Sequence, residues 1–420
     1  MRRRNLFKHL IAMLSVLALL AAACGDDGDD AAVTETTTAT TAAAPDTADD
    51  TMDDDAMDDA MDDDAMDDTM DDDDAMDDDA MDDGDMEEVD DAMALPGEGV
   101  SVTIARANWS TGYMQAAIFA ALLTELGYTV SDPADLELAP SNAFVAMANG
   151  EFDFWANSWF PNHDAFLDGE MPDGSLVREH VTSLGLEMPR SGVQGLITNK
   201  AFADANGMTT LDAMLSDPDV FAAYEAADNS PGDGILQIYG CPDGWGCHVN
   251  INAWIENAGW TNIEQFDIGG YDAMIADAIA RDAAGEPYMV YTWGPSHYVS
   301  DLRPGDNAVW VSIHEDPAIS PTQIEGATSI GNQCTTDPCL LGWDAADIRV
   351  TANNDFLAAN PAAARLFELV TINPVDVALQ NVRMSGGENT EEDIRSHAAA
   401  WIADNRDTVD TWLNNARLLG

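Results

Sequence analysis

Basic residues are scarce in this chain. Its 420 residues include 78 Asp and Glu but only 16 Lys and Arg, which gives a formal net charge of −62 at pH 7. Contacts with nucleic-acid phosphates need clustered basic side chains, so we expect no nucleic-acid partner. An anionic membrane surface would repel the chain for the same reason. Apolar runs are also short: none reaches the ~20 residues of a spanning helix, which excludes a polytopic membrane protein.

The first segment has the features of an export signal. Arg2, Arg3, Arg4 and Lys8 precede an apolar stretch over residues 10–23 that is too short to span a bilayer. This stretch ends in the sequence Leu-Ala-Ala-Ala-Cys24, which resembles the cleavage box of bacterial lipoproteins. We therefore predict a signal peptide over residues 1–23, cleavage before Cys24 and a lipid on the Cys24 thiol. An ordinary signal peptide that happens to contain a cysteine is the alternative.

The next segment is strongly acidic. Residues 25–95 contain 32 acidic residues, no basic ones and no aromatic ones, largely in repeats of Ala-Met-Asp-Asp. Such a composition buries too little apolar surface to offset the entropy lost on ordering, so residues 24–96 are predicted to be a disordered tether. About 70 flexible residues extend roughly 45 Å on average, and repulsion between like charges lengthens them further. The Asp-Met repeats predict weak, nonspecific association with cations, in preference to a metal site.

The remaining residues alternate between strand and helix patterns. Residues 100–105 alternate like a buried strand, and Met114, Ile118 and Leu122 then lie on one face of a predicted helix that ends at Gly127. Asn360-Pro361 is a typical helix start, and Thr390 begins a segment that resembles a capping box. Alternating strands and helices favour an α/β protein with mostly parallel sheets. About 325 residues are too many for one small core, so we expect two lobes.

Four cysteines follow Cys24, in two pairs that are close in sequence. An exported protein with such pairs is expected to contain the disulfides Cys241–Cys247 and Cys334–Cys339. Zinc is the competing hypothesis, but neither pair has the two-residue gap of a zinc knuckle. We therefore favour the disulfides.

The 11 tryptophans are numerous for this length. Trp159, Trp245 and Trp293 lie at loop-like strand ends beside Pro, Gly or Cys, where we expect them to be exposed. The face of an indole attracts a cation without a hydrogen-bond donor, and quaternary ammonium compounds are cations of that kind. Packing in the core is the competing role for any single tryptophan, and it is the role we favour for Trp109 and Trp155.

Three motifs make the chain similar to a known family. They are Asn-Ser-Trp159-Phe-Pro-Asn-His163, Cys241-Pro-Asp-Gly-Trp-Gly-Cys247 and Tyr-Thr-Trp293-Gly-Pro. Together with the run that begins at Asn360, they resemble the periplasmic glycine betaine/proline betaine-binding proteins of ABC transporters, over nearly all of residues 100–419. The resemblance implies an α/β, two-lobed type II periplasmic-binding-protein fold, in which each lobe is a mixed, mostly parallel sheet flanked by helices.

The resemblance also implies roles for single residues. Trp159, Trp245 and Trp293 match the aromatic box around the trimethylammonium group, and Trp109 is a weaker candidate for the rim of the same cleft. His163 and the backbone N–H groups of Gly246 and Cys247 match the donors to the ligand carboxylate. Residues 249–258 independently predict a helix, whose N-terminus would present free N–H groups to an anion. The residues after Pro295 depart from the family pattern, so the fine selectivity stays open.

The predicted lobes are residues 97–199 plus 349–420, and residues 200–348. Residues 194–200 and 347–353 are the expected crossing strands between them. We expect a monomeric, exported, lipid-anchored binding protein that delivers its ligand to ABC permease subunits, with no cofactor and no metal ion. Another compatible solute, such as choline, ectoine or proline, is the alternative ligand. A hydrolase is disfavoured because the cysteines are expected to be paired and no Gly-x-Ser-x-Gly motif is present.

Overall fold

The structure is a computed structural model that describes residues 95–316, 318–320 and 333–419. The predicted signal peptide over residues 1–23, Cys24 and all of the tether except its last two residues lie outside the described residues. Among the helices within these ranges, none is long and apolar enough to cross a membrane.

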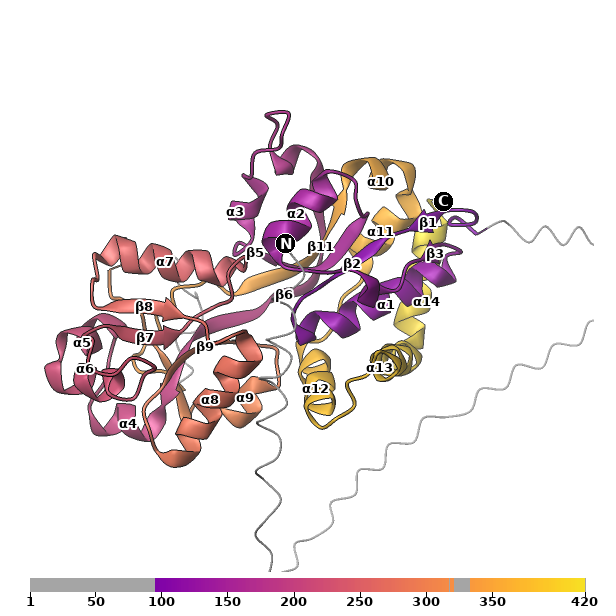
Figure 1. Ribbon diagram of the computed structural model, residues 1–420. Coiled ribbons are helices and arrows are strands. Elements are labelled where there is room, and N and C mark those ends of the chain that lie inside the picture. Colours follow the sequence, from indigo (N-terminus) through magenta and orange to yellow (C-terminus); the bar gives the residue numbers. More distant parts are fainter. Residues whose placement is uncertain (1–94, 317, 321–332, 420) are drawn as a thin grey trace, which may run out of the picture. The chain divides into compact units, whose positions relative to one another are not determined.

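The strands and helices alternate along most of the described chain (Figure 1). The strands are β1 Ser101–Val102, β2 Ile104–Ala107, β3 Thr129–Val130, β4 Glu137–Leu138, β5 Phe154–Phe160, β6 Val181–Asn199, β7 Leu236–Tyr239, β8 Ile263–Phe266, β9 Met289–Gly294, β10 Ala308–Val311 and β11 Ala346–Asn353. The helices are α1 Tyr113–Glu125, α2 Pro140–Ala148, α3 Asp164–Leu167, α4 Lys200–Ala205, α5 Leu211–Ser216, α6 Pro218–Glu225, α7 Gly246–Ala258, α8 Tyr271–Ala284, α9 Tyr298–Asp301, α10 Asn354–Ala359, α11 Pro361–Leu369, α12 Pro374–Ser385, α13 Glu391–Asp404 and α14 Arg406–Arg417.

One long strand, β6, is shared by two halves of the main sheet. Within the described residues, nine strands form this sheet in the order β4-β2-β5-β11-β6-β9-β7-β8, with β10 also paired to β6. Strand β6 pairs with β11 as far as Gly192 and with β9 from Val193 onward. The strand therefore leaves one half and enters the other at this point (Figure 1). The switch comes before residue 199, the predicted lobe boundary, and that boundary stays a prediction.

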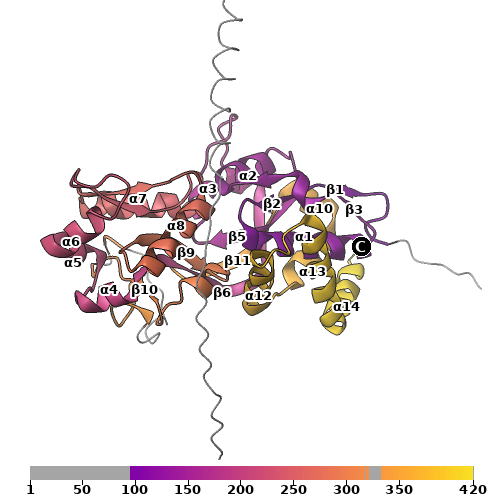
Figure 2. The same cartoon turned by 60° about the horizontal axis from the view of Figure 1, so that its bottom comes forward.

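The two halves have the same construction. Strand β2 pairs in parallel with β4 and β5, and β7 pairs in parallel with β8 and β9. The crossing strands β6 and β11 run antiparallel to their neighbours, so each half is a mixed sheet. Helix α1 packs on β2 and β5, whereas α7 contacts β8 and α8 contacts β9 (Figures 1 and 2). The predicted α/β architecture is confirmed.

Several predicted helix ends are present. Met114, Ile118 and Leu122 of α1 are fully or almost fully buried, and Gly127 follows the helix with a φ of 94°. Thr390 caps α13 in a capping box with Asp393. The predicted helix start at Asn360-Pro361 is also present, since α11 begins at Pro361 with Asn360 as its N-cap residue. The Asn360 side chain makes no capping hydrogen bond in the described structure, and its amide donates instead to the carbonyl of Phe356 in the preceding helix.

Two strands are longer than the sequence indicated. The sequence pattern predicts a short strand over residues 152–155, whereas β5 runs from Phe154 to Phe160. Strand β6 begins at Val181 and keeps its pairing through register shifts opposite Ile348, with Gly185 at a φ of 64°. A side chain at Gly185 would meet the carbonyl oxygen of Phe367 at 2.3 Å, so only glycine fits there. Register shifts and glycines of this kind break the alternation of apolar and polar residues, so the sequence pattern does not reveal one continuous strand.

Candidate functional site

The four candidate tryptophans come from four different elements. Trp159 lies in β5 and Trp293 in β9, Trp245 immediately precedes α7, and Trp109 lies two residues after the end of β2. Trp159 and Trp293 lie near the ends of their strands and Trp245 lies in the loop after β7, as the sequence predicts. The prediction that these three side chains are exposed is wrong. Trp159, Trp245 and Trp293 are 4%, 6% and 3% exposed, because segments from both halves of the sheet cover them.

These side chains line one pocket. All six residues of the predicted site lie in its wall, and Trp109 joins them. Among the described residues that form the wall, there is no Asp, Glu, Lys or Arg. Its members are Trp109, Pro140, Trp159, Asn162, His163, Gln194, Trp245, Gly246, Cys247, Tyr291 and Trp293.

The indole rings of the pocket lie at steep angles to one another. Trp109 and Trp245 have ring centroids 5.1 Å apart and planes at 64°, and Trp245 and Trp293 have centroids 5.6 Å apart and planes at 72°. Trp159 packs against the backbone of Gly192, where an added Cβ would meet the ring at 2.5 Å. Rings held in this way offer faces in several directions around one cavity. Faces so arranged suit a rounded cation.

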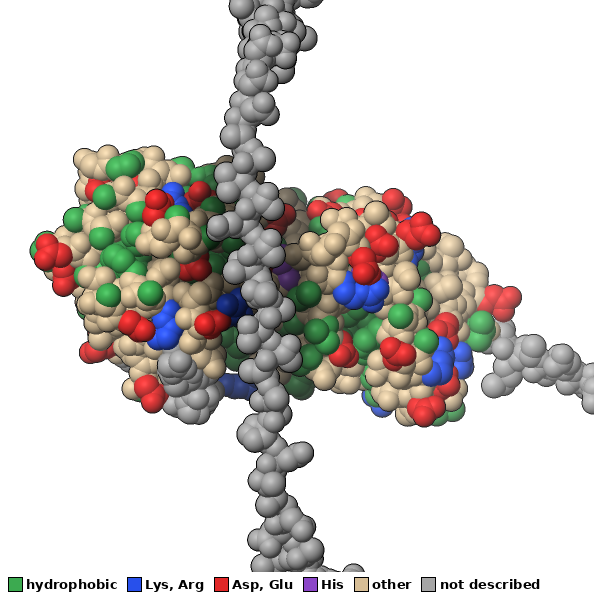
Figure 3. Space-filling view, turned by 90° about the horizontal axis from the view of Figure 1, so that it is seen from below, with side chains coloured by type: hydrophobic (Ala, Val, Ile, Leu, Met, Phe, Trp, Pro, Cys, Tyr) green, Lys and Arg blue, Asp and Glu red, His purple; other side chains and the backbone are tan. Residues whose placement is uncertain are grey.

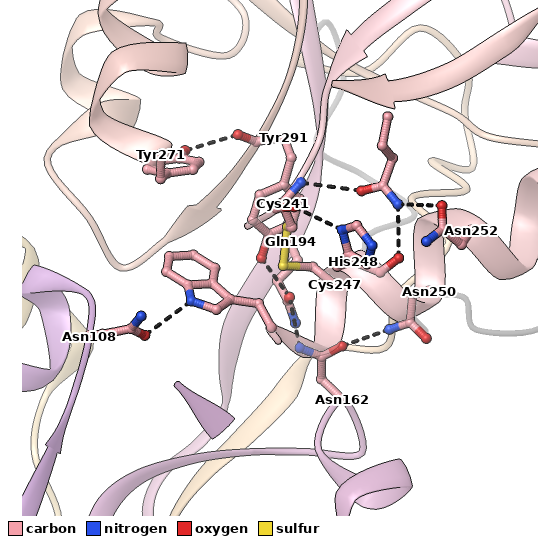
Figure 4. Close-up of a disulfide and its surroundings, with 12 residues drawn as sticks. Asn108, Asn162, Gln194, Cys241, Cys247, His248, Asn250, Asn252, Tyr271 and Tyr291 are labelled. Atoms are coloured by element: carbon pink, nitrogen blue, oxygen red, sulfur yellow. Dashed lines mark hydrogen bonds between the residues drawn. A yellow bond between two sulfur atoms is a disulfide. The ribbon is translucent and has the colours of Figure 1, made fainter. Parts of the chain in front are cut away.

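The N-terminus of α7 supplies backbone donors to the same pocket. Among the described residues, no hydrogen-bond acceptor faces the N–H groups of Gly246 and Cys247, which lie in the first turn of the helix. The Cys241–Cys247 disulfide ties this turn to the end of β7, with Cα atoms 5.9 Å apart (Figure 4). Because the first N–H groups of a helix have no partner within it, they form a natural site for an anion.

His163 adds a side-chain donor. Its Nδ1 accepts a hydrogen bond from the Trp159 backbone N–H at 3.0 Å, so the neutral ring carries its proton on Nε2. The imidazole stacks on Trp155 with centroids 5.7 Å apart and planes at 13°, among other aromatic rings. Burial lowers the pKa of His163 to about 3, because a charged ring loses its water there. The ring is therefore neutral near pH 7 and can donate through Nε2–H.

Three polar residues of the pocket were missed by the sequence prediction. Gln194 accepts hydrogen bonds from the hydroxyl of Tyr291 at 2.8 Å and from the Asn162 amide at 3.3 Å (Figure 4). Its own amide nitrogen is buried and has no hydrogen-bond partner among the described residues. Asn162 and Tyr291 both lie within the quoted tryptophan motifs, which is the signal that could have identified them. Gln194 lies on β6 outside any motif.

A wider cleft adjoins the pocket. It shares Trp109, Trp245 and Trp293 with the pocket and extends past Asp272 and Asp301 toward Met384 at the end of α12. Figure 3 shows the molecule from below, where acidic and basic side chains are interspersed with polar and apolar ones. The carboxylates of Asp272 and Asp301 in this cleft favour cations near the pocket.

Three other histidines have local roles. His248 contacts the Cys241 carbonyl through Nδ1 at 3.0 Å, and His314 accepts from the Asp316 N–H at 2.8 Å. His297 is half-buried and packs on Tyr298 at the wider cleft. The second disulfide, Cys334–Cys339, is also present, and Trp155 is fully buried, as predicted.

Comparison with known proteins places the chain in a family. Residues 100–404 match the model of the substrate-binding domain of ABC-type glycine betaine transport systems. The chain belongs to this family. The glycine betaine-binding periplasmic protein OusX of Dickeya dadantii is 32% identical over 329 residues, which cover 77% of this chain and 92% of that protein. Homologues in the periplasm indicate an extracytoplasmic location for this family member as well.

Solved structures of the same fold support the architecture. A choline-binding protein of an ABC transporter, in complex with choline, matches with a TM-score of 0.55 and 14% identity, covering 75% of this chain and 92% of its own. The lactococcal OpuAC protein, closed on glycine betaine, matches with a TM-score of 0.51 and 14% identity, covering 75% and 99%. At this identity the likeness establishes the type II periplasmic-binding-protein fold of the family.

Proposed function

We propose that this substrate-binding protein captures glycine betaine, or a closely related quaternary ammonium osmolyte with a carboxylate, and delivers it to an ABC permease. One observation carries the proposal. A single pocket without a charged side chain in its wall combines four tryptophans with free N–H donors. Such a pocket suits a zwitterion, because the ligand brings both charges and the protein supplies a complementary partner for each.

The aromatic side of the pocket suits the cation. A trimethylammonium group has no N–H and cannot form an ordinary hydrogen bond, so the negative face of an indole is its best neutral partner. A desolvated contact of this kind contributes about 2 kcal/mol. Trp109 adds a fourth ring to the three that the sequence predicted. The aromatic box therefore supplies much of the affinity for any methylated ammonium ligand.

The donors select for the carboxylate. The candidate donors to the carboxylate are the N–H groups of Gly246 and Cys247 and the Nε2–H group of His163. The unpaired amide nitrogen of Gln194 lies in the same wall. Hydrogen bonds to a charged group contribute ~1.5–3 kcal/mol each. Choline keeps the cation but lacks the carboxylate, so it leaves these donors unpaired. We therefore infer that glycine betaine binds more tightly than choline.

Ligand capture is proposed to involve closure of two lobes, residues 97–199 plus 349–420 and residues 200–348. The pocket wall supports this division because His163 and Trp159 precede the partner switch of β6, whereas Trp245 and Trp293 follow it. A ligand that contacts both sides favours the closed state over the open one. We infer that the protein acts as a monomer.

A fluorescence titration tests the proposed ligand. Tryptophan emission of the purified protein would be recorded while one compound at a time is added. The compounds are trimethylglycine (glycine betaine), proline betaine, choline, ectoine, proline and a neutral sugar. We expect saturable changes with the betaines at the lowest concentrations, a weaker response to choline and none to the sugar. Saturation by the sugar or by ectoine, with no response to the betaines, would contradict the proposal.

The attachment to the membrane is a separate proposal. Export followed by lipidation of Cys24 is supported by the sequence of the signal segment and by the extracytoplasmic relatives. In the native host, the Cys24→Ser variant should appear in the soluble fraction, whereas the unchanged protein should remain with membranes and carry a lipid mass at its mature N-terminus. An unlipidated N-terminus in the unchanged protein would contradict it.

A further inference from the structure

The indole N–H groups of all four pocket tryptophans have acceptors. Trp109 and Trp159 both donate to the Oδ1 atom of Asn157, at 2.8 Å and 2.9 Å. Trp293 donates to the Thr111 hydroxyl at 3.3 Å, and Trp245 donates to Asn108 at 3.0 Å. An indole N–H held by a fixed acceptor restricts rotation of the ring. The acceptors therefore determine which way the aromatic faces point.

Three of these bonds belong to one buried polar relay. Beyond its two indole donors, Asn157 donates through Nδ2 to Oε1 of Gln115, and Gln115 donates through Nε2 to the carbonyl of Thr111 at 2.8 Å. The Thr111 hydroxyl then accepts from Trp293. We call Asn157, Gln115 and Thr111 the amide relay. Its three members are 1%, 0% and 1% exposed, so protein groups rather than bulk water complete these bonds.

The chemistry of indole fixes the direction of the whole relay. An indole N–H can only donate, so the atom that faces both Trp109 and Trp159 must be the oxygen of Asn157. The Asn157 nitrogen must then face Gln115, which sets the orientation of that amide as well. Because each step has one possible direction, the relay holds its tryptophans in a single arrangement.

The relay also joins segments that lie on either side of β6 in the sequence. Asn157, Gln115 and Thr111 all precede β6, whereas Trp293 lies in β9, which pairs with β6 after the switch at Val193. The Thr111–Trp293 bond therefore links the relay to the part of the box that the other half of the sheet supplies. One set of side chains orients rings from both halves.

We propose that Asn157 is a positioning residue for the aromatic box, which orients Trp109 and Trp159 directly and Trp293 through Gln115 and Thr111. The proposal rests on the proposed function, because it assigns these rings to the cationic end of the ligand. Asn157 lies outside the pocket wall and acts on the ligand through the tryptophans. Loss of the Asn157 side chain should therefore lower the affinity for every ligand that carries the same cation, and by the same factor.

The test compares Asn157→Leu with Asn157→Asp. Leucine has a similar size but no acceptor, so both indole N–H groups lose their partner. Aspartate keeps an oxygen for the indoles, but it sets a second oxygen against Gln115 Oε1 and brings a carboxylate into a buried site, so we expect its cost in stability and not in the affinity of the folded protein. By calorimetry, we expect Asn157→Leu to weaken trimethylglycine and choline binding at least tenfold each, with the ratio of the two dissociation constants unchanged. Asn157→Asp should retain binding within about threefold of the unchanged protein.

A spectroscopic readout separates positioning from simple destabilisation. The near-ultraviolet circular dichroism of the ligand-free protein reports the fixed environment of tryptophans, and Asn157→Leu should alter this signal while the far-ultraviolet spectrum stays the same. The matched control is Asn353→Leu, another buried asparagine in the same half of the sheet, which caps α10 and donates to Met147 O at 2.9 Å. This control should lower the melting temperature and leave both dissociation constants unchanged.

A milder variant covers the case in which Asn157→Leu does not fold. Thr111→Val is isosteric and removes only the acceptor of Trp293, so we expect three- to tenfold weaker binding of both ligands. Unchanged binding in Thr111→Val, together with unchanged binding in any folded Asn157→Leu protein, would overturn the proposal. If the unchanged protein binds no methylated ammonium compound at all, the proposed function fails, and the tryptophan signal of the variants still tests whether the relay orients the rings.

Discussion

Two disulfide-closed loops follow β6, and they differ in what their backbone does. Cys241–Cys247 and Cys334–Cys339 are separated by six and five positions, with Cα atoms 5.9 Å and 5.8 Å apart. In the second loop the Thr335 N–H donates to the Trp310 carbonyl of β10 at 2.9 Å, and just after this loop the Leu340 carbonyl accepts from the Ile313 N–H at 2.8 Å. In the first loop the Gly246 and Cys247 N–H groups find no acceptor among the described residues.

The same covalent closure therefore has two consequences. Backbone groups that pair with β10 make the second loop part of the scaffold. Unpaired donors at the start of α7 suit the first loop to the proposed recognition of the ligand carboxylate, and the disulfide ties these donors to the segment that follows β7. The first loop also touches the other half of the sheet: a Cβ at Gly246 would lie 2.5 Å from the Asn162 carbonyl oxygen. Parallel substitutions in the two loops should thus separate binding from stability.

The largest difference is expected between replacement of Trp245, which lies in the first loop, and replacement of Trp310, which pairs with the second loop. Trp245→Ala removes a face of the box, so we expect the affinity for trimethylglycine to fall by about 2–4 kcal/mol, roughly 30- to 1,000-fold. Trp310→Ala should cost about 3–5 kcal/mol of unfolding free energy through a core cavity and leave the affinity of the folded protein unchanged. Calorimetry and urea unfolding measure the two effects. Equal loss of affinity in both variants would erase the distinction between the loops.

Added methyl groups should give a smaller contrast. Gly246→Ala places its Cβ against the Asn162 backbone, and we expect about 1–3 kcal/mol weaker binding, because the two halves can no longer approach fully. Gly342→Ala follows the second loop, where φ is 80° and the new Cβ would meet Trp254 at 2.5 Å. It should lower the melting temperature instead. A Gly246→Ala protein that binds normally would show that this close approach is not needed for capture.

Opening the disulfides should have a modest effect on affinity. The double variants Cys241→Ser/Cys247→Ser and Cys334→Ser/Cys339→Ser should each lose about 2 kcal/mol of unfolding free energy, as expected for loops this short. The Cys241→Ser/Cys247→Ser variant should also bind trimethylglycine about fivefold more weakly, because the N–H donors of its loop must then be ordered when the ligand binds. The second pair should keep its affinity. Unaltered binding in the first pair would mean that α7 alone holds the donors.

The smallest expected effect concerns pH. The amide donors of the first loop do not titrate, and burial holds the pKa of His163 near 3, below its ordinary 6.5. Protonation of His163 favours the unfolded chain, so its contribution to stability is complete above about pH 6.5 and is lost as the pH falls toward 3. Affinity should therefore be constant between about pH 5.5 and 8, with no proton uptake in calorimetry. Stronger binding with proton uptake as the pH falls through 6.5 would contradict a neutral His163.

Much of this site could be predicted from local sequence. Trp159, His163 and the Trp245-Gly246-Cys247 turn lie in short motifs, and the structure brings them into one pocket. Trp109 was assigned to packing because its role depends on Trp245, which is distant in sequence and lies 5.1 Å away between ring centroids. Gln194 and Asn157 depend on long-range contacts in the same way. Sequence periodicity contains no signal for such partners.

The fold was predictable to a similar degree. Alternating patterns indicated the α/β architecture, since they reflect burial within single elements. The full length of β6 could not be predicted, because Gly185, Pro189 and the register shifts interrupt its pattern while β11 maintains the pairing. Long-range pairing also determines where β6 changes partner. Local propensity therefore identifies most elements, and tertiary contacts define their extents.

Calorimetric titration of the purified protein with trimethylglycine and with choline tests the central claim most directly. We predict that both bind and that trimethylglycine binds at least tenfold more tightly, because only this ligand offers a carboxylate to the N–H groups of Gly246 and Cys247. Equal dissociation constants for the two ligands would contradict the assignment of that loop as the anion site.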